Sequence, residues 1–163
     1  MQIIIGIVGL YMLMLVALFI FQRNLMYHTD AVIAPIADTQ IPDAKIKKLK
    51  SEQGLVLTSW YLPPKDGKPV IVYFHGNAGT ISDRDYKVAP WYAAGYGIWL
   101  TGYRGFGDNP GKPSEAGLYN DARAVFKALL DEGIGPDHIF IYGESLGTGV
   151  ATIELIMSRT AQT

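Results

Sequence analysis

The sequence predicts an α/β fold, in which a mainly parallel sheet flanked by helices follows one N-terminal transmembrane helix. Three observations support this prediction. Residues 3–21 contain no charged side chain, short apolar runs alternate with helical patterns from residue 70 onward, and a strand-like run leads directly into a Gly-x-Ser-x-Gly segment. Alternating strands and helices are typical of sheets whose ligands bind at the carboxyl ends of the strands.

Length and composition exclude several classes of protein. The chain has 163 residues, 49% of them hydrophobic, which fits one globular domain plus a membrane segment. A net charge of −1 lacks the basic excess of a nucleic-acid-binding protein, so no nucleic acid is expected as a partner. The absence of cysteine excludes disulfides, thiolate metal sites and cysteine nucleophiles. We expect neither a metal nor a cofactor.

The N-terminal apolar run, residues 3–21, has the length of about twenty residues that a helix needs to cross a ~30 Å hydrocarbon core. A cleavable signal peptide would need a basic start, a shorter apolar core and a small-residue cleavage site, and none of these is present. A buried core helix would rarely be apolar on all sides. We therefore predict an uncleaved single-pass anchor over residues 1–22, with the lipid bilayer as its partner.

The orientation of this anchor stays open, because Arg23 is the only basic side chain close to either end. By the positive-inside rule it weakly favours a cytoplasmic catalytic part. Residues 23–44 are predicted to be a juxtamembrane connector, broken by Pro35 and Pro42. Residues 25–27 are expected to pack at the membrane surface or against the domain.

The remaining part, residues 45–163, is predicted to begin with a hairpin. Residues 45–51 alternate lysines with apolar side chains, as an edge strand does when it avoids pairing with other chains. Residues 55–62 form the second strand, which ends at two prolines. Residues 70–74 are a continuous apolar run, which is typical of a central strand buried on both faces.

Helices and strands alternate after this central strand. Ser82 suits a helix start, and Pro90 is expected to keep that helix short. Residues 96–101 and residues 139–142 are predicted to be buried strands. Between them Ser114 opens a longer helix, whose apolar face is formed by Leu118, Ala122, Val125, Phe126, Leu129 and Leu130.

The last strand leads into Gly143-Glu144-Ser145-Leu146-Gly147, and an apolar helical pattern follows, which is the layout of a nucleophile elbow. A serine hydroxyl reacts well only when it stands clear of the backbone beside a general base. The two flanking glycines leave room for the sharp turn that presents Ser145 in this way. The amide of Leu146 would point toward a developing oxyanion. The alternative is an ordinary Gly-rich turn, and the known phosphate-binding loops fit this segment less well.

Three segments converge on one edge of the predicted sheet. The loop His75-Gly76-Asn77-Ala78-Gly79 follows residues 70–74, Tyr103 follows residues 96–101, and Ser145 follows the last strand. A glycine-bearing loop after a central strand allows backbone amides to approach a ligand closely. The candidate site is therefore expected at the carboxyl ends of these strands.

These segments resemble the α/β-hydrolase superfamily, and more closely its membrane-anchored, Bem46-like serine hydrolase branch. Order and spacing agree along nearly the whole chain. The matching segments are Phe21-Gln22-Arg23-Asn24-Leu25-Met26-Tyr27, His75-Gly76-Asn77-Ala78-Gly79, Tyr103-Arg104-Gly105-Phe106-Gly107, Pro113-Ser114-Glu115-Ala116-Gly117-Leu118-Tyr119-Asn120-Asp121-Ala122 and Gly143-Glu144-Ser145-Leu146-Gly147.

The resemblance implies an acyl-transfer serine hydrolase for small acyl ester, thioester or amide substrates, with an acyl-enzyme on Ser145. It implies that the amides of Asn77 and Leu146 form the oxyanion hole. It also implies a structural role for Tyr103 and Arg104, which would brace their loop. The supporting residues around the serine and the oxyanion loop would be His75, Gly76, Gly143 and Gly147.

A general base for Ser145 is missing from the pattern. In this superfamily the acid and the histidine follow the serine along the chain, but the eighteen residues after Ser145 (163 − 145) contain no histidine and no aspartate. His28 belongs to the connector, and His138 lies roughly 20 Å away at the other end of the strand. By the resemblance, His75 shapes the oxyanion loop. Glu154 is expected to point away from the site.

We therefore expect an incomplete α/β-hydrolase fold that is truncated after the elbow, with little or no turnover in the chain as given. The strands over residues 70–74, 96–101 and 139–142 would then be partly uncovered, leaving an exposed edge and an apolar patch. A non-catalytic membrane-anchored binding module and a non-functional fragment are the alternatives.

Overall fold

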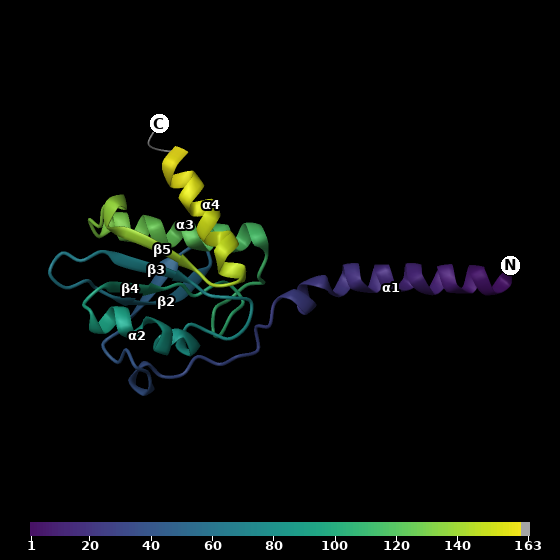
Figure 1. The fold of residues 1–163 in the computed structure, drawn as a ribbon, viewed down its shortest axis with the longest axis horizontal. Helices are drawn as coiled ribbons and strands as arrows, with labels where there is room; N and C mark the ends of the chain where they lie inside the picture. The colour runs from purple at the N-terminus through teal and green to yellow at the C-terminus, as the bar shows by residue number, and fades with distance from the viewer. Residues whose placement is uncertain (161–163) are drawn as a thin grey trace.

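The computed structural model describes residues 1–160, with side chains through Ile153. At its centre is a five-stranded sheet with the strand order β1-β2-β4-β3-β5 (Figure 1). The strands are β1 Lys45–Lys50, β2 Val56–Leu62, β3 Val70–Phe74, β4 Gly97–Leu100 and β5 Ile139–Gly143. The α-helices are α1 Gln2–Met26, α2 Asp85–Ala93, α3 Glu115–Asp131 and α4 Leu146–Thr160.

The sheet is mixed rather than mainly parallel in its pairing. β3 pairs in parallel with β4 and with β5, whereas β2 runs antiparallel to both β1 and β4. The predicted hairpin of β1 and β2 is confirmed, and it turns at Gly54, whose φ of 82° suits a residue without a Cβ. The parallel half of the sheet is the half that carries the candidate site.

β3 is buried on both faces, as predicted, and its alternating side chains feed two separate cores. Val70, Val72 and Phe74 pack with the apolar faces of α3 and α4. Ile71 and Tyr73 pack on the other face, where α2 lies. Figure 1 shows this three-layer arrangement, with α3 and α4 on one side of the sheet and α2 on the other.

The prediction that β5 is a buried strand is wrong for one of its faces. Phe140 is 56% exposed and Tyr142 is 43% exposed, because the strand lies at the edge of the described sheet and is only partly covered on the α2 side, where Trp91 contacts Tyr142. Ile139 and Ile141 pack on the α3 side. The expected exposed apolar edge is therefore present, but it is confined to β5, since β3 and β4 are fully buried.

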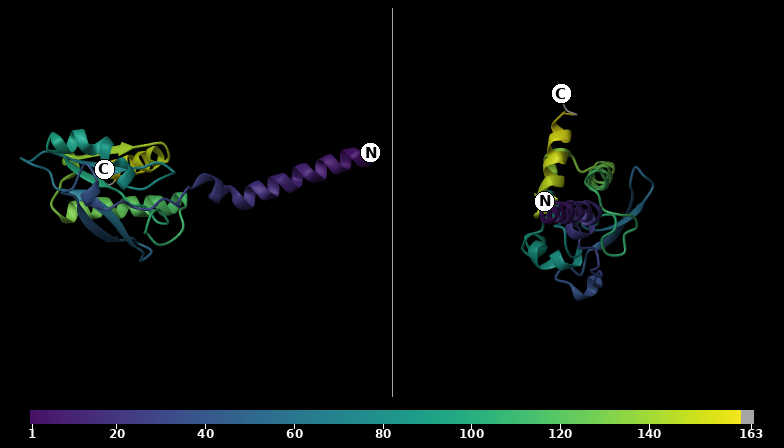
Figure 2. Two further views of the ribbon diagram at one scale, coloured as in Figure 1. Left: turned by 90° about the horizontal axis from the view of Figure 1, so that it is seen from below. Right: turned by 90° about the vertical axis from the view of Figure 1, so that its right-hand side faces the viewer.

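α1 projects away from the domain (Figures 1 and 2). By length and composition it is a candidate membrane span, and none of its apolar window is buried inside the domain. The helix continues to Met26 and so includes the first residues of the predicted connector, and residues 22–26 contain neither proline nor glycine. The next residue, Tyr27, is buried in the domain with 8% of its surface exposed.

The connector after α1 packs against the domain along its length. Ile41 and Ala44 are buried in the core on the α2 side. The backbone amide of Ala34 donates to Ser82 Oγ at 3.0 Å, and that of Gln40 donates to a carboxylate oxygen of Asp85 at 2.8 Å. The segment therefore covers one edge of the domain and leaves little free chain between α1 and the sheet.

Candidate active site

Ser145 occupies a strained backbone conformation at the junction of β5 and α4. Its φ of 50° is in the left-handed region, which a residue with a Cβ adopts only when the surroundings impose it. The turn is held by two hydrogen bonds, from Gly147 N to Glu144 O at 2.8 Å and from Thr148 N to Ser145 O at 2.9 Å. The side chain stands at an exposed position, as the chemistry of a serine nucleophile requires.

The two glycines around this turn are required by close packing. A Cβ at Gly147 would lie 2.1 Å from the carbonyl oxygen of Phe74, and a Cβ at Gly143 would lie 2.6 Å from the carbonyl oxygen of Gly147. Neither approach is tolerated by van der Waals contact, so the first turn of α4 packs directly against the end of β3. The structure therefore gives a steric reason for the Gly-x-Ser-x-Gly spacing.

The loop after β3 faces the serine. A side chain on Gly76 would come 3.5 Å from Ser145 Cβ, so the loop backbone passes directly beside the serine. Among the described residues, no acceptor binds the backbone N–H of Asn77 or that of Leu146. Both amides are therefore available as donors, as the predicted oxyanion hole requires.

The same loop is hydrogen-bonded to the chain that leaves α1, a contact that no sequence motif indicates. The side-chain amide of Asn77 donates to the backbone carbonyl of Met26 at 2.9 Å. The amide of His28 donates to the carbonyl of Asn77 at 2.9 Å, and His28 pairs with Ala78 in an isolated parallel bridge. The side chain of Asn77 is therefore engaged by the end of α1.

His75 lies beneath this loop rather than beside the serine. Its Nδ1 is 2.8 Å from the carbonyl of Gly76, to which it donates in the neutral form, and its ring contacts Tyr103 and Phe106. Burial lowers the pKa of His75 to about 4, so the imidazole is neutral at pH 7. Its Nε2 and the Tyr103 hydroxyl are buried without a partner among the described residues.

Glu144, the residue before the serine, is tied to α2 and to the sheet. Its carboxylate accepts from Tyr73 at 2.5 Å and from Arg84 at 3.2 Å, and it lies 3.0 Å from Lys87. Burial alone would raise the pKa of Glu144, but the hydrogen bonds from Tyr73, Lys87 and Arg84 lower it to about 2. The members of this cluster are up to 71 positions apart, so no local motif indicates it.

Tyr103 and Arg104 lie in the core below the site. The guanidinium of Arg104 binds the buried carboxylate of Asp121 through Nη2 at 2.7 Å and Nε at 3.0 Å, and its backbone amide donates to the same carboxylate at 2.9 Å. Tyr103 stacks on Phe74 at the end of β3. Both contacts join the loop after β4 to α3 and β3.

Within the described part of the chain, no histidine forms a hydrogen bond with Ser145. His138 lies at the amino end of β5, at the far edge of the sheet from the serine. The structure brings His28, a residue of the connector, beside the 75–79 loop through its backbone. The side chain of Glu154 lies outside the described residues.

A small apolar pocket adjoins the elbow. It has a volume of about 200 Å³ and lies between the end of α1, the start of α3 and the first turn of α4. Its lining is mostly apolar, with Met26, Tyr27, Leu118, Leu146 and Val150, and it also includes Glu115 and Tyr119, which are hydrogen-bonded to each other. An uncharged chain of a few carbon atoms fits a space of this size and lining.

Comparison with known proteins agrees with this geometry. The family model for the alpha/beta hydrolase fold matches residues 69–155, more than half of the chain. An uncharacterized protein of Mycobacterium tuberculosis is 37% identical over 133 residues, which cover 80% of this chain and 47% of that protein. Lysophosphatidylserine lipase ABHD12 of Danio rerio is 37% identical over 127 residues, which cover 64% of this chain and 32% of that protein.

Solved structures show the same fold. An alpha-beta hydrolase from Vibrio vulnificus superimposes with a TM-score of 0.56 at 35% identity, over 64% of this chain and 36% of that one. An esterase from Pyrococcus furiosus has a TM-score of 0.61 at 20% identity, over 77% of this chain and 49% of that one, and shows the fold alone. The chain spans about half the length, or less, of the curated relatives described above. From the elbow, the sheet and the matching family model, the chain belongs to the alpha/beta hydrolase fold family.

Proposed function

We propose that Ser145 is the nucleophile of a membrane-anchored serine hydrolase that cleaves esters through an acyl-enzyme. The observation that carries this proposal is the strained φ of 50° at an exposed serine between two glycines that admit no Cβ. In such a hydrolase Ser145 Oγ attacks the acyl carbonyl, the alcohol leaves, and water then releases the acid. The amides of Asn77 and Leu146 would stabilise the oxyanion of each tetrahedral intermediate.

The substrate class is proposed to be the ester of an amphiphilic lipid. Two relatives, from Danio rerio and Xenopus tropicalis, carry the name lysophosphatidylserine lipase. In this chain the apolar pocket lies directly beside Leu146 and the end of α1. If α1 crosses a bilayer, an ester at the membrane surface lies on the same side of the domain as Ser145.

We further propose that residues 1–163 alone turn over slowly, because no described histidine reaches Ser145. Hydrolysis would then need an imidazole from outside these residues. The oxyanion hole and binding alone leave on the order of 10³-fold acceleration over water when triad members are removed from such enzymes. The alternative is a membrane-anchored binding module that uses the same edge of the sheet without chemistry, and the missing base is the observation that favours it.

A fluorophosphonate probe, which phosphonylates activated serines, tests both proposals. Three proteins are compared: the 163-residue chain, its Ser145→Ala variant, and a version extended through the downstream reading frame. We expect slow labelling of the short chain, fast labelling of the extended chain, and none of the variant. Free imidazole in the buffer should accelerate labelling of the short chain, since it replaces the missing base, and should leave the variant unlabelled.

The outcomes distinguish the serine hydrolase from the binding module. Fast labelling of the short chain without imidazole would show that an internal base serves Ser145, and the proposal of low turnover would be wrong. If neither the extended chain nor the imidazole-treated chain is labelled, while circular dichroism shows a folded domain, the nucleophile assignment fails and the binding module is favoured.

A further inference from the structure

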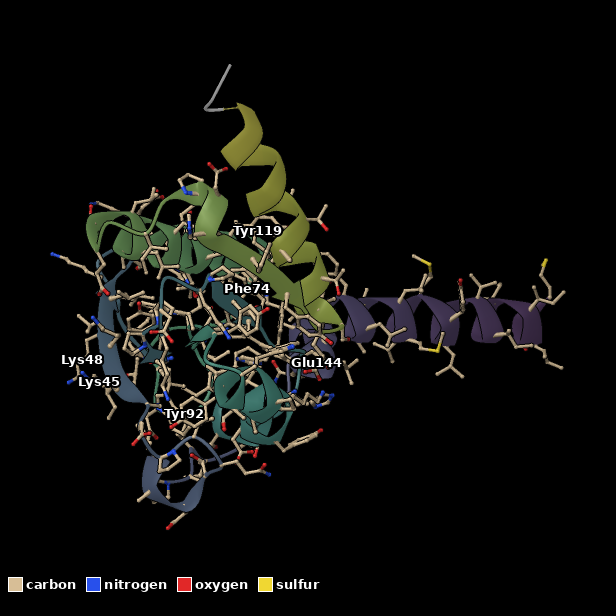
Figure 3. The ribbon with its side chains drawn as sticks, turned by 60° about the vertical axis from the view of Figure 1, so that its left-hand side comes forward. Lys45, Lys48, Phe74, Tyr92, Tyr119 and Glu144 are labelled. Carbon is tan, nitrogen blue, oxygen red and sulfur yellow. The ribbon has the colours of Figure 1, made fainter. Side chains whose placement is uncertain are left out.

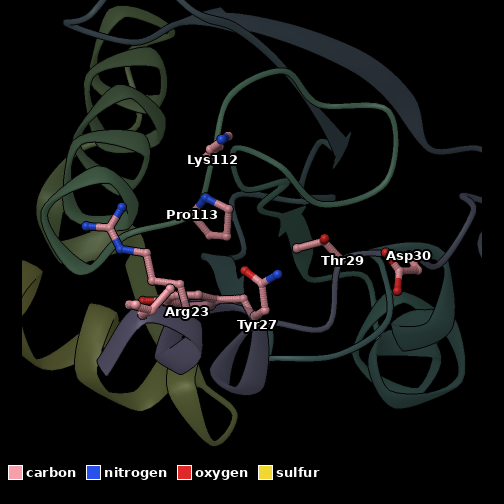
Figure 4. Close-up of a pocket in the computed structure, with 8 residues that line it drawn as sticks. Arg23, Tyr27, Thr29, Asp30, Lys112 and Pro113 are labelled. Carbon is pink, nitrogen blue, oxygen red and sulfur yellow. The ribbon is translucent and has the colours of Figure 1, made fainter. Parts of the chain in front are cut away.

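A second pocket lies at the base of α1, on the other side of Tyr27 from the apolar pocket. We call it the base pocket, and it has a volume of about 360 Å³ (Figure 4). The lining residues that matter here are Ile20, Arg23, Asn24, Thr29, Asp30 and Lys112. They come from the last turns of α1, the chain that follows it, and the loop before α3, so the pocket exists only because these segments meet.

The base pocket carries free positive charge. Neither the guanidinium of Arg23 nor the ammonium of Lys112 forms an ion pair or hydrogen bond with any described residue. Asp30 is the one carboxylate in the lining, so two cations and one anion give a net charge of +1. Figure 4 shows Arg23 and Asp30 at opposite sides of the pocket. The hydroxyl of Thr29 and the amide of Asn24 add hydrogen-bond donors.

The lining changes from apolar to charged along the axis of α1. Residues 3–21 span about 28 Å at 1.5 Å per residue, close to the ~30 Å of a hydrocarbon core. Ile20 lies within this span, whereas Arg23 is the first charged residue beyond it. In a membrane-inserted chain the base pocket is therefore at the depth of the phosphate groups, with its apolar wall toward the acyl chains.

The base pocket is separate from the reacting groups. Its lining includes no residue of the elbow or of the oxyanion loop, and it shares only Tyr27 with the apolar pocket beside Leu146. A molecule held there does not place an ester at Ser145. Its occupant is thus expected to be a bound ligand and not the molecule that is cleaved.

We propose that the base pocket binds the headgroup of an anionic bilayer phospholipid, with Arg23 and Lys112 contacting its phosphate. The proposal rests on the membrane insertion of α1 put forward above. The net positive charge disfavours a neutral headgroup relative to an anionic one. Arg23 matches a phosphate with a planar fork of donors, and Lys112 adds a point charge from the opposite segment.

The test uses the full chain in detergent, titrated with phosphatidylglycerol or phosphatidylcholine, with the bound fraction read by native mass spectrometry. We expect tighter binding of phosphatidylglycerol. Lys112→Gln should weaken that binding about fivefold, the effect of one basic residue near an anionic lipid surface. Lys48→Gln is the matched control, because it removes the same charge from β1, on the far side of the domain from α1 (Figure 3).

Equal weakening by Lys112→Gln and Lys48→Gln would show unspecific charge attraction and would overturn the proposal, as would equal affinity for the two lipids. Displacement of the lipid by millimolar inorganic phosphate would identify a soluble anion as the occupant instead. Ser145→Ala should bind phosphatidylglycerol as the unmodified chain does. This result is independent of the labelling experiment, so a failure of one proposal can be told from a failure of the other.

Discussion

The side-chain amide of Asn77 donates a hydrogen bond of 2.9 Å to the main-chain carbonyl of Met26, the last residue of α1. A helix leaves its final carbonyls without intrahelical partners, and Asn77 satisfies one of them. The loop proposed as one wall of the oxyanion hole is thereby joined to the end of the apolar helix. The backbone bond from His28 to Asn77 fixes the same two segments a second time.

Asn77→Ala should loosen this junction. The loss of one such hydrogen bond costs about 0.5–1.5 kcal/mol, so amides of the 76–79 loop should exchange with deuterium roughly fivefold faster. Hydrogen exchange read by mass spectrometry checks this. Gln22→Ala is the control, because it removes an exposed amide that bonds only within α1. Unchanged exchange in both variants would mean that the loop is held without the Asn77 side chain.

Gly147→Ala should destabilise the domain, whereas Gly149→Ala should not. The new Cβ at residue 147 would lie 2.1 Å from the Phe74 carbonyl, but the one at residue 149 meets nothing within 4 Å. We expect a loss of about 1–3 kcal/mol for the first, from overpacking, and a gain of up to about 1 kcal/mol for the second, from helix propensity. Urea unfolding followed by tryptophan fluorescence measures both, and equal stability of the two variants would refute the packing of α4 on β3.

Glu144→Gln should reduce stability at neutral pH and flatten its acid dependence. The pKa of Glu144 is lowered to about 2, against an ordinary value of 4.5, so its stabilising contribution is complete above pH 4.5 and is lost as the pH falls toward 2. A carboxylate that accepts charged donors contributes about 1–3 kcal/mol. Unfolding free energies from urea titrations between pH 2 and 7 test this.

His75 also contributes folding stability that is lost at low pH, but over a different pH range. Glu144→Gln should leave this contribution of His75 in place. Burial lowers the pKa of His75 from 6.5 to about 4, so stability from this group is present above pH 6.5 and lost as the pH falls to about 4. Parallel stability curves for Glu144→Gln and the unmodified chain below pH 4.5 would show that the Glu144 cluster does not form.

Asp121→Asn should be among the most damaging single changes in the core. It leaves Arg104 buried beside a neutral partner, and breaking a buried ion pair costs about 3–5 kcal/mol. Asp131→Asn is the matched control: it removes an exposed pair with Lys127 on the same helix, where the expected loss is about 0.3–0.5 kcal/mol. Thermal unfolding in detergent distinguishes the two, and a similar shift for both would contradict the buried pair.

Local patterns explain why much of the fold was predictable. β3 is a continuous apolar run. The side chain of Ser114 accepts a hydrogen bond from the amide of Gly117, as expected for the residue that caps the start of α3. The exposed face of β5 was not predictable, because exposure of Phe140 depends on which elements lie beside it and not on the strand itself. An apolar run is compatible with either outcome.

The candidate site also has a part that was predictable from the sequence and a part that was not. Ser145 and its glycines form a five-residue motif, so the sequence alone predicts the turn. Glu144 with Arg84, and Asn77 with Met26, are contacts between segments 60 and 51 positions apart. No periodicity or motif signals such pairs, since only the folded topology brings them together. The role of Ser145 in catalysis itself stays a prediction.

The chain packs against the domain immediately after α1, so the helix is attached to the domain without a flexible linker. Tyr27 is buried immediately after the last helical residue, and His28 is already paired with the 76–79 loop. A bilayer whose thickness differs from the length of the apolar helix would tilt that helix. The tilt would be transmitted to the 76–79 loop, because no flexible segment lies between them. If α1 crosses a bilayer as proposed, the thickness of that bilayer would act on the geometry around Ser145.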